Sequence, residues 1–343
     1  MAIYAENLEA LAALLPAEVV GTPVPGARPE PELAPLVHAV FDDATSLYTA
    51  PVDVTGWRGI LIRDHARASQ YDLVAELLRQ GVAVPDSVAC LARSGHGMHG
   101  FRGRPWSAHP GNIHLVVHFA PGVAVERFES AFTALAAVSA AEAAESVPGV
   151  ETAGGARLKW VNDVVVAGCK VGGVLAYTQT RDAVVSSVVL GIGLNVETSP
   201  GVERSPEVPA AASLRELVTA RAGTATSSRT TSAAEGGAGG IAGATGPGAS
   251  SAAGVWTGPV VVALLDALRR NYLRLLDDGA TPLLDAYRTR SSIIGRHVTV
   301  VSDDVARTVI AEGRVTGIGD GLELHIEGVP APVTRGRIGN VSE

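Results

Sequence analysis

A long stretch of small residues divides this sequence of 343 residues. From Ala222 to Gly254 the chain consists almost entirely of Ala, Gly, Ser and Thr, and Arg229 and Glu235 are its only charged residues. Such a segment cannot bury enough apolar surface to offset the entropy that it would lose on ordering. We therefore predict a disordered linker over residues 222–258, with folded parts before and after it.

The composition of the whole chain is that of a folded protein. Hydrophobic residues make up 47% of the sequence, which is enough for a core on each side of the linker. The net charge of −8, without a basic block, argues against binding to DNA or to an anionic membrane through charge. Cys90 and Cys169 lack the spacing of a zinc site, and we expect both to be reduced. The sequence shows neither a signal peptide nor an apolar run long enough to span a membrane, so we expect a cytoplasmic protein.

Helix and strand patterns alternate before the linker. Apolar residues at helical spacing around residues 73–78 predict a helix that ends at Gly81, and residues 126–146 predict an Ala-rich helix. Alternating or continuous apolar residues predict strands over residues 113–119, 157–166 and 184–195.

After the linker, an apolar stripe over residues 264–276 predicts a helix. Short strands separated by turns in residues 293–343 predict a small β-barrel. Residues 1–55 contain a proline-rich stretch and no clear helix-turn-helix pattern. They could complete the sheet or cover the active site.

The glycine-rich loop, SGHGMHGFRGRPW at residues 94–106, is a candidate anion site. Glycines allow backbone N–H groups to approach an anion closely, and Arg102 and Arg104 can pair with phosphate or carboxylate oxygens. A plain surface loop is the alternative. Five histidines suggest a metal cluster by their number alone, but no metal-binding motif such as HExxH is present, so we favour structural or surface histidines. They are His96, His99, His109, His114 and His118.

A second candidate site lies within residues 158–178. Lys159, Asn162 and Asp163 interrupt an apolar run, which costs free energy unless they are paired or face a ligand. Lys170 then precedes Val-Gly-Gly, where another backbone or a substrate can approach closely. A hairpin with a polar tip is the alternative. Farther along, Asn195 ends a buried strand and can hydrogen-bond a ligand oxygen.

Taken in order, these segments resemble motifs of the biotin–protein ligases, which are relatives of the lipoate–protein ligases. The resemblance covers roughly residues 60–218 and, less specifically, residues 260–340. The matching segments are SQYD at 69–72 (family STND), MHGFRGRPW at 98–106 (GRGRxGRxW), KWVND at 159–163 (KWPND), GCKVGGVL at 168–175 (GRKxAGIL), GIGLN at 191–195 (GIGxN) and AASL at 211–214 (ATSL).

The resemblance implies an α+β fold with a central mixed β-sheet flanked by helices, like the cores of class II aminoacyl-tRNA synthetases. It places the catalytic domain in residues 56–221, with a helical end at 259–292, and an SH3-like β-barrel in residues 293–343. Segment 1–55 stays poorly defined, and its lack of a helix-turn-helix pattern argues against the DNA-binding role of a repressor.

The implied activity is that of an ATP-dependent biotin–protein ligase. Such an enzyme uses ATP and Mg²⁺ to form biotinyl-5′-AMP and transfers biotin to a lysine of a biotin carboxyl carrier protein domain. We expect a monomer or a homodimer that binds neither DNA nor membrane. Two alternatives stay open: a ligase of the same fold for lipoate, octanoate or another acid, and a non-catalytic protein that binds biotin or the adenylate.

The resemblance also implies roles for individual residues. Lys170 would bridge the substrate carboxylate and the α-phosphate, Arg104 would hold phosphate, and Trp106 would pack on the adenine. Asn195 would contact the nucleotide, Asp163 would orient the acceptor lysine or the metal, and Lys159 and Asn162 would shape the pocket. The remaining candidate binding residues are Ser69, Gln70, Gly95, His99, Gly100, Phe101 and Gly173, and no metal ligands are assigned.

Departures from the family motifs cluster on the side of the acid substrate. Met98, His99 and Phe101 replace the usual Gly, Arg and Arg, and Gly95 stands where Gln is common. Gln70 and Tyr71 replace Thr and Asn, whereas Val161 in place of Pro is a smaller change. The motifs therefore support activation by ATP more strongly than they support biotin, and a larger or more apolar acid could suit Phe101 and Met98.

Overall fold

The computed structural model describes residues 2–42, 46–125, 130–201, 210–221, 255–304 and 306–342, and for Asn340 the backbone alone. Residues 222–254 of the predicted linker lie outside the described part of the chain. Helix α6 begins at Thr257, within the last residues of that predicted segment.

The centre of the molecule is a mixed sheet of eleven strands, as the fold class predicted. Strands β1, β4 and β5 run parallel to one another, and the remaining pairs are antiparallel. The strand order is β2-β3-β1-β4-β5-β6-β11-β10-β9-β8, and β7 pairs with β11. The strands are β1 (Ala2–Ala5), β2 (Val24–Pro25), β3 (Tyr48–Ala50), β4 (Gly59–Ala66), β5 (Val88–Gly95), β6 (Ile113–Phe119), β7 (Val123–Ala124), β8 (Ala156–Lys159), β9 (Asp163–Val166), β10 (Cys169–Arg181) and β11 (Val184–Leu194).

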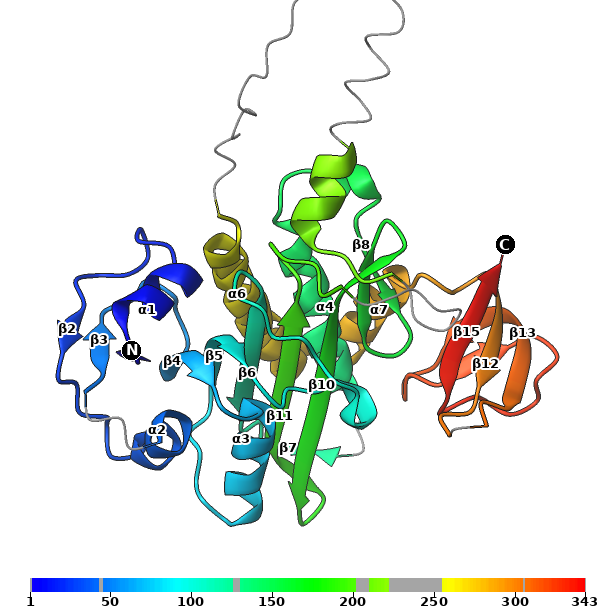
Figure 1. The fold of residues 1–343 in the computed structure, drawn as a ribbon. Coiled ribbons are helices and arrows are strands. Elements are labelled where there is room, and N and C mark those ends of the chain that lie inside the picture. The colour runs from blue at the N-terminus through cyan, green and yellow to red at the C-terminus, as the bar shows by residue number, and fades with distance from the viewer. Residues whose placement is uncertain are drawn as a thin grey trace, which may run out of the picture.

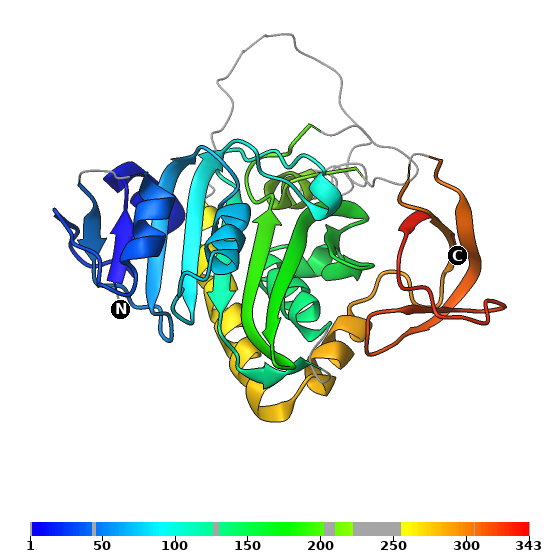
Figure 2. The ribbon, with the colours of Figure 1, turned by 90° about the horizontal axis from the view of Figure 1, so that it is seen from below.

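Helices cover both faces of this sheet (Figures 1 and 2). One face packs against α1 (Leu8–Leu14), α4 (Ala131–Glu145), α6 (Thr257–Asp278) and α7 (Thr281–Thr289). The opposite face packs against α2 (Ala34–Phe41) and α3 (Gln70–Arg79). Because most residues of α4 are alanines, this helix is buried between the sheet and α6. Residues 214–221 are also helical.

Strand β6 shows how the sequence divides between the two faces. Its odd-numbered residues, such as Leu115 and Phe119, enter the larger core, whereas Val116 packs with α2 and α3 on the other side. This alternation follows from the two-residue period of a strand. Because α2 and α3 are short, they leave part of this face of the sheet uncovered. A cavity lies there, over β6, β11 and β10.

The N-terminal residues extend the sheet. Strand β1 pairs in parallel with β4 and antiparallel with β3, which places Ile3 in the larger core and Tyr4 in the smaller one. Residues 2–50 thus supply three strands and two helices at one end of the molecule (Figure 1). These strands have two to four residues each, too few for a recognisable period in the sequence.

The C-terminal strands form a separate antiparallel sheet of order β14-β13-β12-β15. It is consistent with the predicted SH3-like domain, but within the described residues its edge strands do not pair, so the sheet does not close into the expected barrel. The strands are β12 (His297–Val301), β13 (Val309–Ile318), β14 (Leu324–Ile326) and β15 (Arg337–Ser342).

This small sheet contacts the central domain through the turn that follows β13. The indole Nε1 of Trp160 donates a hydrogen bond to the carbonyl oxygen of Leu322 at 2.6 Å. Arg288 of α7 donates to the carbonyl oxygen of Ile318 at 2.8 Å and pairs with Asp320. Among the described helices, none is long and apolar enough to cross a membrane.

Candidate active site

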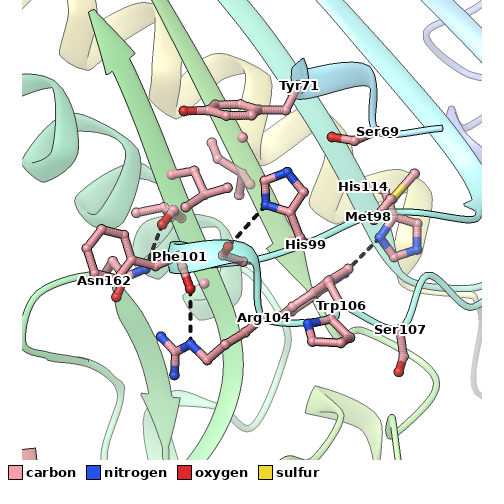
Figure 3. A pocket seen from close by; sticks show the side chains of 18 of the residues that line it. Ser69, Tyr71, Met98, His99, Phe101, Arg104, Trp106, Ser107, His114 and Asn162 are labelled. Atoms are coloured by element: carbon pink, nitrogen blue, oxygen red, sulfur yellow. Dashed lines mark hydrogen bonds between the residues drawn. The ribbon is translucent and has the colours of Figure 1, made fainter. Parts of the chain in front are cut away.

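The main cavity lies on the open face of the central sheet. It has a volume of about 350 Å³, its floor is formed by β6, β11 and β10, and the glycine-rich loop and the first turn of α3 form its walls. Figure 3 shows Tyr71 and Ser69 on one side of the loop and Arg104 on the other. The polar or charged side chains in its lining are Ser69, Gln70, Tyr71, His99, Arg104, Trp106, Ser107, His114, Asn162, Lys170 and Asn195.

The glycine-rich loop folds back on itself beside the cavity. The N–H of Trp106 donates to the carbonyl oxygen of Met98 at 2.9 Å, and the N–H of Gly100 donates to that of Arg104 at 2.7 Å. The tip is a 3₁₀ turn in which Arg102 and Gly103 have φ values of 60° and 71°. Glycine adopts this left-handed backbone without steric cost, so Gly103 fits the turn. The loop is therefore an ordered hairpin with its own hydrogen bonds.

Two contacts tie this hairpin to other parts of the molecule. The guanidinium of Arg102 pairs with the carboxylate of Asp303, which follows β12, at 3.0 Å. The imidazole Nε2 of His99 meets the carboxylate of Asp72 in α3 at 2.8 Å, and its Nδ1 lies 3.1 Å from the carbonyl oxygen of Gly100. The Gly100 carbonyl and Asp72 raise the pKa of His99 and favour its charged form, although burial opposes them.

Alternate glycines of β11 make room for two aromatic side chains. A Cβ atom on Gly193 would lie 2.4 Å from Cζ2 of Trp106, and one on Gly191 would lie 3.1 Å from Cδ2 of Tyr71. The Trp106 and Tyr71 rings therefore lie directly against the strand, which explains the Gly-x-Gly pattern.

His114 of β6 fixes the Trp106 ring. The indole N–H donates to Nδ1 of His114 at 3.3 Å, and Nε2 of His114 lies 3.1 Å from the carbonyl oxygen of His109. Burial lowers the pKa of His114 to about 4, so the ring is neutral near pH 7 and can accept at Nδ1 while it donates at Nε2. The histidine that the sequence indicated as structural thus positions a cavity side chain.

The opposite end of the site is rich in cations. Lys170 Nζ contacts Asp163 Oδ1 at 2.5 Å, and Lys159 lies across from Asp163 in the β8–β9 pair. Burial lowers the pKa of Lys159, and the neighbouring charges of Lys170, Arg337 and Arg104 add to this effect, while Asp163 opposes it. Lys159 and Lys170 thus lie beside Asp163, and the charges of Arg104 and Arg337 also act on Lys159, so this end of the site is suited to an anion.

The AASL segment holds the ends of the two strands that carry Lys170 and Asn195. The N–H of Lys170 donates to the carbonyl of Ala210 at 2.8 Å, and the N–H of Ala212 donates back to that of Lys170 at 3.0 Å. The N–H of Leu214 bonds the carbonyl of Asn195 at 2.9 Å. Backbone pairing therefore keeps these two cavity residues in place.

The structure gathers most of the predicted site residues around one cavity. Asp163 and Lys159 lie beside Lys170 rather than in the lining. Gly95 instead lines a neighbouring cavity on the other side of the loop, with His65, His96 and His109. The predicted residues in the main lining are Ser69, Gln70, His99, Gly100, Phe101, Arg104, Trp106, Asn162, Lys170, Gly173 and Asn195.

Other lining residues were not among the predicted ones. Tyr71 and His114 belong to this group, as do Gly191 and Gly193. The alternation of the glycines along a predicted strand was a usable signal, because residues two apart face the same side. No group of three His, Cys, Asp or Glu side chains in the described residues is arranged to hold a metal ion.

Comparison with known proteins gives a family match for part of the chain. Residues 84–195 match the biotin/lipoate A/B protein ligase family. The matched segment contains the glycine-rich loop, Asp163 and Lys170, so it agrees with the resemblance that the sequence motifs indicated.

Individual relatives share part of the chain. The chain is 29% identical over 117 residues to the bifunctional ligase/repressor BirA of Bacillus subtilis, an alignment that covers 34% of each protein. It is 32% identical over 127 residues to the biotin–[acetyl-CoA-carboxylase] ligase of Paracoccus denitrificans, covering 37% of this chain and 51% of the relative. The matched region thus spans between a third and about half of the length of these curated relatives.

The fold is shared more widely than the sequence. The structure of the biotin protein ligase from Aquifex aeolicus in complex with biotin and ATP superposes with a TM-score of 0.54 at 17% identity. This superposition covers 82% of the present chain and 98% of the Aquifex chain.

Proposed function

We propose that this protein is an ATP-dependent biotin–protein ligase. It would form biotinyl-5′-AMP from biotin and ATP and transfer biotin to a lysine of a biotin carboxyl carrier protein domain. The observation that carries the proposal is the cationic end of a largely apolar cavity, where Lys170 and Arg104 are in the lining and Lys159 lies nearby. An acid with an apolar body can bind there with its carboxylate beside the phosphates of a nucleotide. The ligase activities for which the Paracoccus and Bacillus relatives are named support the same activity.

The first step would activate the acid. A carboxylate oxygen attacks the α-phosphorus of ATP, the bond to pyrophosphate breaks, and the acyl-adenylate forms. Negative charge increases on the transferred phosphoryl group and on the leaving pyrophosphate, so fixed cations stabilise the transition state. Lys170 would bridge the carboxylate and the α-phosphate, and Arg104 would hold phosphate. Trp106 would pack on the adenine, and Asn195 would contact the nucleotide.

The second step would transfer the acyl group. The nitrogen of a carrier lysine attacks the acyl carbon, AMP leaves, and the nitrogen loses a proton. Asp163 would orient the incoming amine, because it is the carboxylate nearest to Lys170. The glycine-rich loop would shield the adenylate from water, a common use of loops beside reactive intermediates.

Mg²⁺ would enter with the nucleotide. This ion keeps several waters and usually binds phosphates together with one or two carboxylates. Asp163 would supply one such carboxylate, and the described residues hold no cluster of three metal-ligand side chains. The ion would neutralise phosphate charge during adenylation.

Replacing Lys170 tests the proposed activity. Removing a charge-assisted contact to developing charge costs on the order of 3 kcal/mol, about a hundredfold in rate. We therefore expect Lys170→Ala to slow biotin-dependent exchange of pyrophosphate into ATP by at least about a hundredfold.

The control is Arg181→Ala, which removes an exposed cation from the far end of the same strand. It should leave the exchange rate unchanged. Exchange by Lys170→Ala near the wild-type rate would contradict the role given to Lys170.

A further inference from the structure

Asn112 is a fully buried polar residue next to the cavity residue Asn195. It directly precedes β6 and is 0% exposed, and Asn195 directly follows the neighbouring strand β11. A buried carboxamide costs free energy unless its donors and its acceptor are paired. The hydrogen-bond partners of the Asn112 side chain all lie within residues 195–198, so this side chain is committed to one short segment of the cavity wall.

The side chain of Asn112 fixes the backbone that follows Asn195. Its Oδ1 accepts from three successive N–H groups, at 3.0 Å from Val196, 3.2 Å from Glu197 and 3.1 Å from Thr198. Its Nδ2 donates to the carbonyl oxygen of Thr198 at 2.8 Å. Successive N–H groups that converge on one oxygen form a concave turn around it. The course of the chain directly after Asn195 therefore depends on a single carboxamide.

The same side chain also determines how the Asn195 carboxamide is turned. Nδ2 of Asn112 donates to Oδ1 of Asn195 over 3.5 Å, a long hydrogen bond. The two ends of a carboxamide have similar shapes, and a neighbouring donor favours the orientation in which the oxygen faces it. Nδ2 of Asn195 donates to no acceptor among the described residues, and Asn195 lines the main cavity. This N–H group is therefore left for a ligand.

A different set of contacts anchors the segment from its other side. The carboxylate of Glu197 pairs with Arg215 and accepts a hydrogen bond from the N–H of Trp256 at 2.6 Å. These contacts do not involve Asn112. Removing the Asn112 side chain should therefore change the orientation of Asn195 more than the attachment of the segment to the rest of the fold.

We propose that Asn112 is a positioning residue that turns Nδ2 of Asn195 toward an acceptor atom of the bound nucleotide. Asn112 does not line the cavity itself, and it acts through Asn195 and the backbone of residues 196–198. The inference rests on the proposed function, because that function assigns Asn195 to the nucleotide. Binding of the acid should not depend on Asn112.

The experiment measures nucleotide binding without chemistry. The α–β bridge of α,β-methylene ATP cannot be cleaved, so its Kd in calorimetry reports binding alone. We expect Asn112→Ala to raise this Kd, and the KM for ATP in pyrophosphate exchange, on the order of 10-fold, the effect of about one lost hydrogen bond. The KM for biotin should stay unchanged. Asn112→Asp cannot donate to Asn195 and should also raise the Kd, so it supplies the same comparison if the alanine variant does not fold.

Two comparisons separate positioning from a loss of stability. Asn271→Ala is the matched control, because Asn271 is a buried asparagine of α6 that donates to Ser139 at 3.0 Å on the other face of the sheet. It should lower the melting temperature and leave the Kd unchanged. A double-mutant cycle with Asn195→Ala tests the route of the effect. Once residue 195 is alanine, Asn112→Ala should change the Kd little further.

The possible failures are distinguishable. An unchanged Kd in Asn112→Ala, a rise equal to that in Asn271→Ala, or additive effects of Asn112→Ala and Asn195→Ala would overturn the positioning role and leave the ligase function standing. A wild-type protein that neither binds the analogue nor exchanges pyrophosphate would instead overturn the proposed function, and the inference about Asn112 with it.

Discussion

At the scale of single residues, the site depends on side chains that other residues hold in place. Trp106 lies against Gly193 and is fixed by the hydrogen bond to His114. Lys170 is held by the carboxylate of Asp163 and by backbone bonds to the AASL segment. Changes at Gly193 and His114 should therefore alter the site although neither residue carries a proposed chemical role.

Gly193→Ala should displace the Trp106 ring. The new Cβ would lie 2.4 Å from Cζ2 of Trp106, closer than atoms can approach without movement. Overpacking of this kind destabilises by about 1–3 kcal/mol. We expect a lower free energy of unfolding in a denaturant titration and a higher KM for ATP. Gly317→Ala is the control, because its added Cβ would meet no atom within 4 Å, and equal effects of the two variants would contradict the packing argument.

His114 should make stability depend on pH under acidic conditions. Burial lowers its pKa from 6.5 to about 4, so between these values the unfolded state binds more protons than the folded state. The stabilisation present above pH 6.5 should therefore be lost as the pH falls toward about 4. Thermal unfolding of the wild type and of His114→Asn across this pH range tests the expected pH dependence. The wild type should lose more stability on acidification than the variant does. Parallel plots of melting temperature against pH would contradict the role given to His114.

At the scale of elements, the glycine-rich loop joins three parts of the fold. It leaves β5, contacts α3 through His99 and Asp72, and contacts the C-terminal sheet through Arg102 and Asp303. The small sheet therefore takes part in ordering a wall of the cavity. Since the Arg102 side chain is 45% exposed, this ion pair should contribute little free energy and serve mainly to limit motion of the tip.

Arg102→Ala should loosen the tip of the loop. A partly exposed ion pair is worth up to about 1 kcal/mol, which corresponds to at most about a fivefold change in an opening equilibrium. Hydrogen exchange of residues 98–106 should become faster by no more than that factor, while the exchange of β11 stays the same. Glu312→Gln, an exposed change on β13, is the control. Unchanged exchange in the loop of Arg102→Ala would show that the ion pair does not restrain it.

At the scale of the whole molecule, lysine is almost absent. The sequence contains only two lysines, Lys159 and Lys170, and both lie in the candidate active site. Lys159 is partly buried, and the ammonium of Lys170 is paired with Asp163. An acyl-adenylate reacts with free amines. Because the sequence has no lysine outside the candidate site, the rest of the described surface offers no lysine amine for this reaction.

The protein should therefore resist acylation by its own intermediate. After incubation with biotinyl-5′-AMP, mass spectrometry should find little label on wild-type side chains. Arg181→Lys places one lysine at an exposed position and should gain one label there. If Lys159 or Lys170 of the wild type were labelled to the same extent as the lysine introduced by Arg181→Lys, the protection expected from burial and pairing would be contradicted.

The sequence by itself indicated the resemblance to the ligase family, the mixed sheet flanked by helices, and the charged residues of the candidate site. These follow from motifs and apolar periods that extend over many residues. The sequence did not reveal the N-terminal strands, because strands of two to four residues are too short for a period.

Only the tertiary structure decided how distant residues meet. It paired Lys170 with Asp163, seated Trp106 on Gly193 and joined Arg102 to Asp303. Such contacts depend on strand register and on the packing of α3 and the C-terminal sheet, and a local sequence pattern does not encode the distance between segments that come together only on folding.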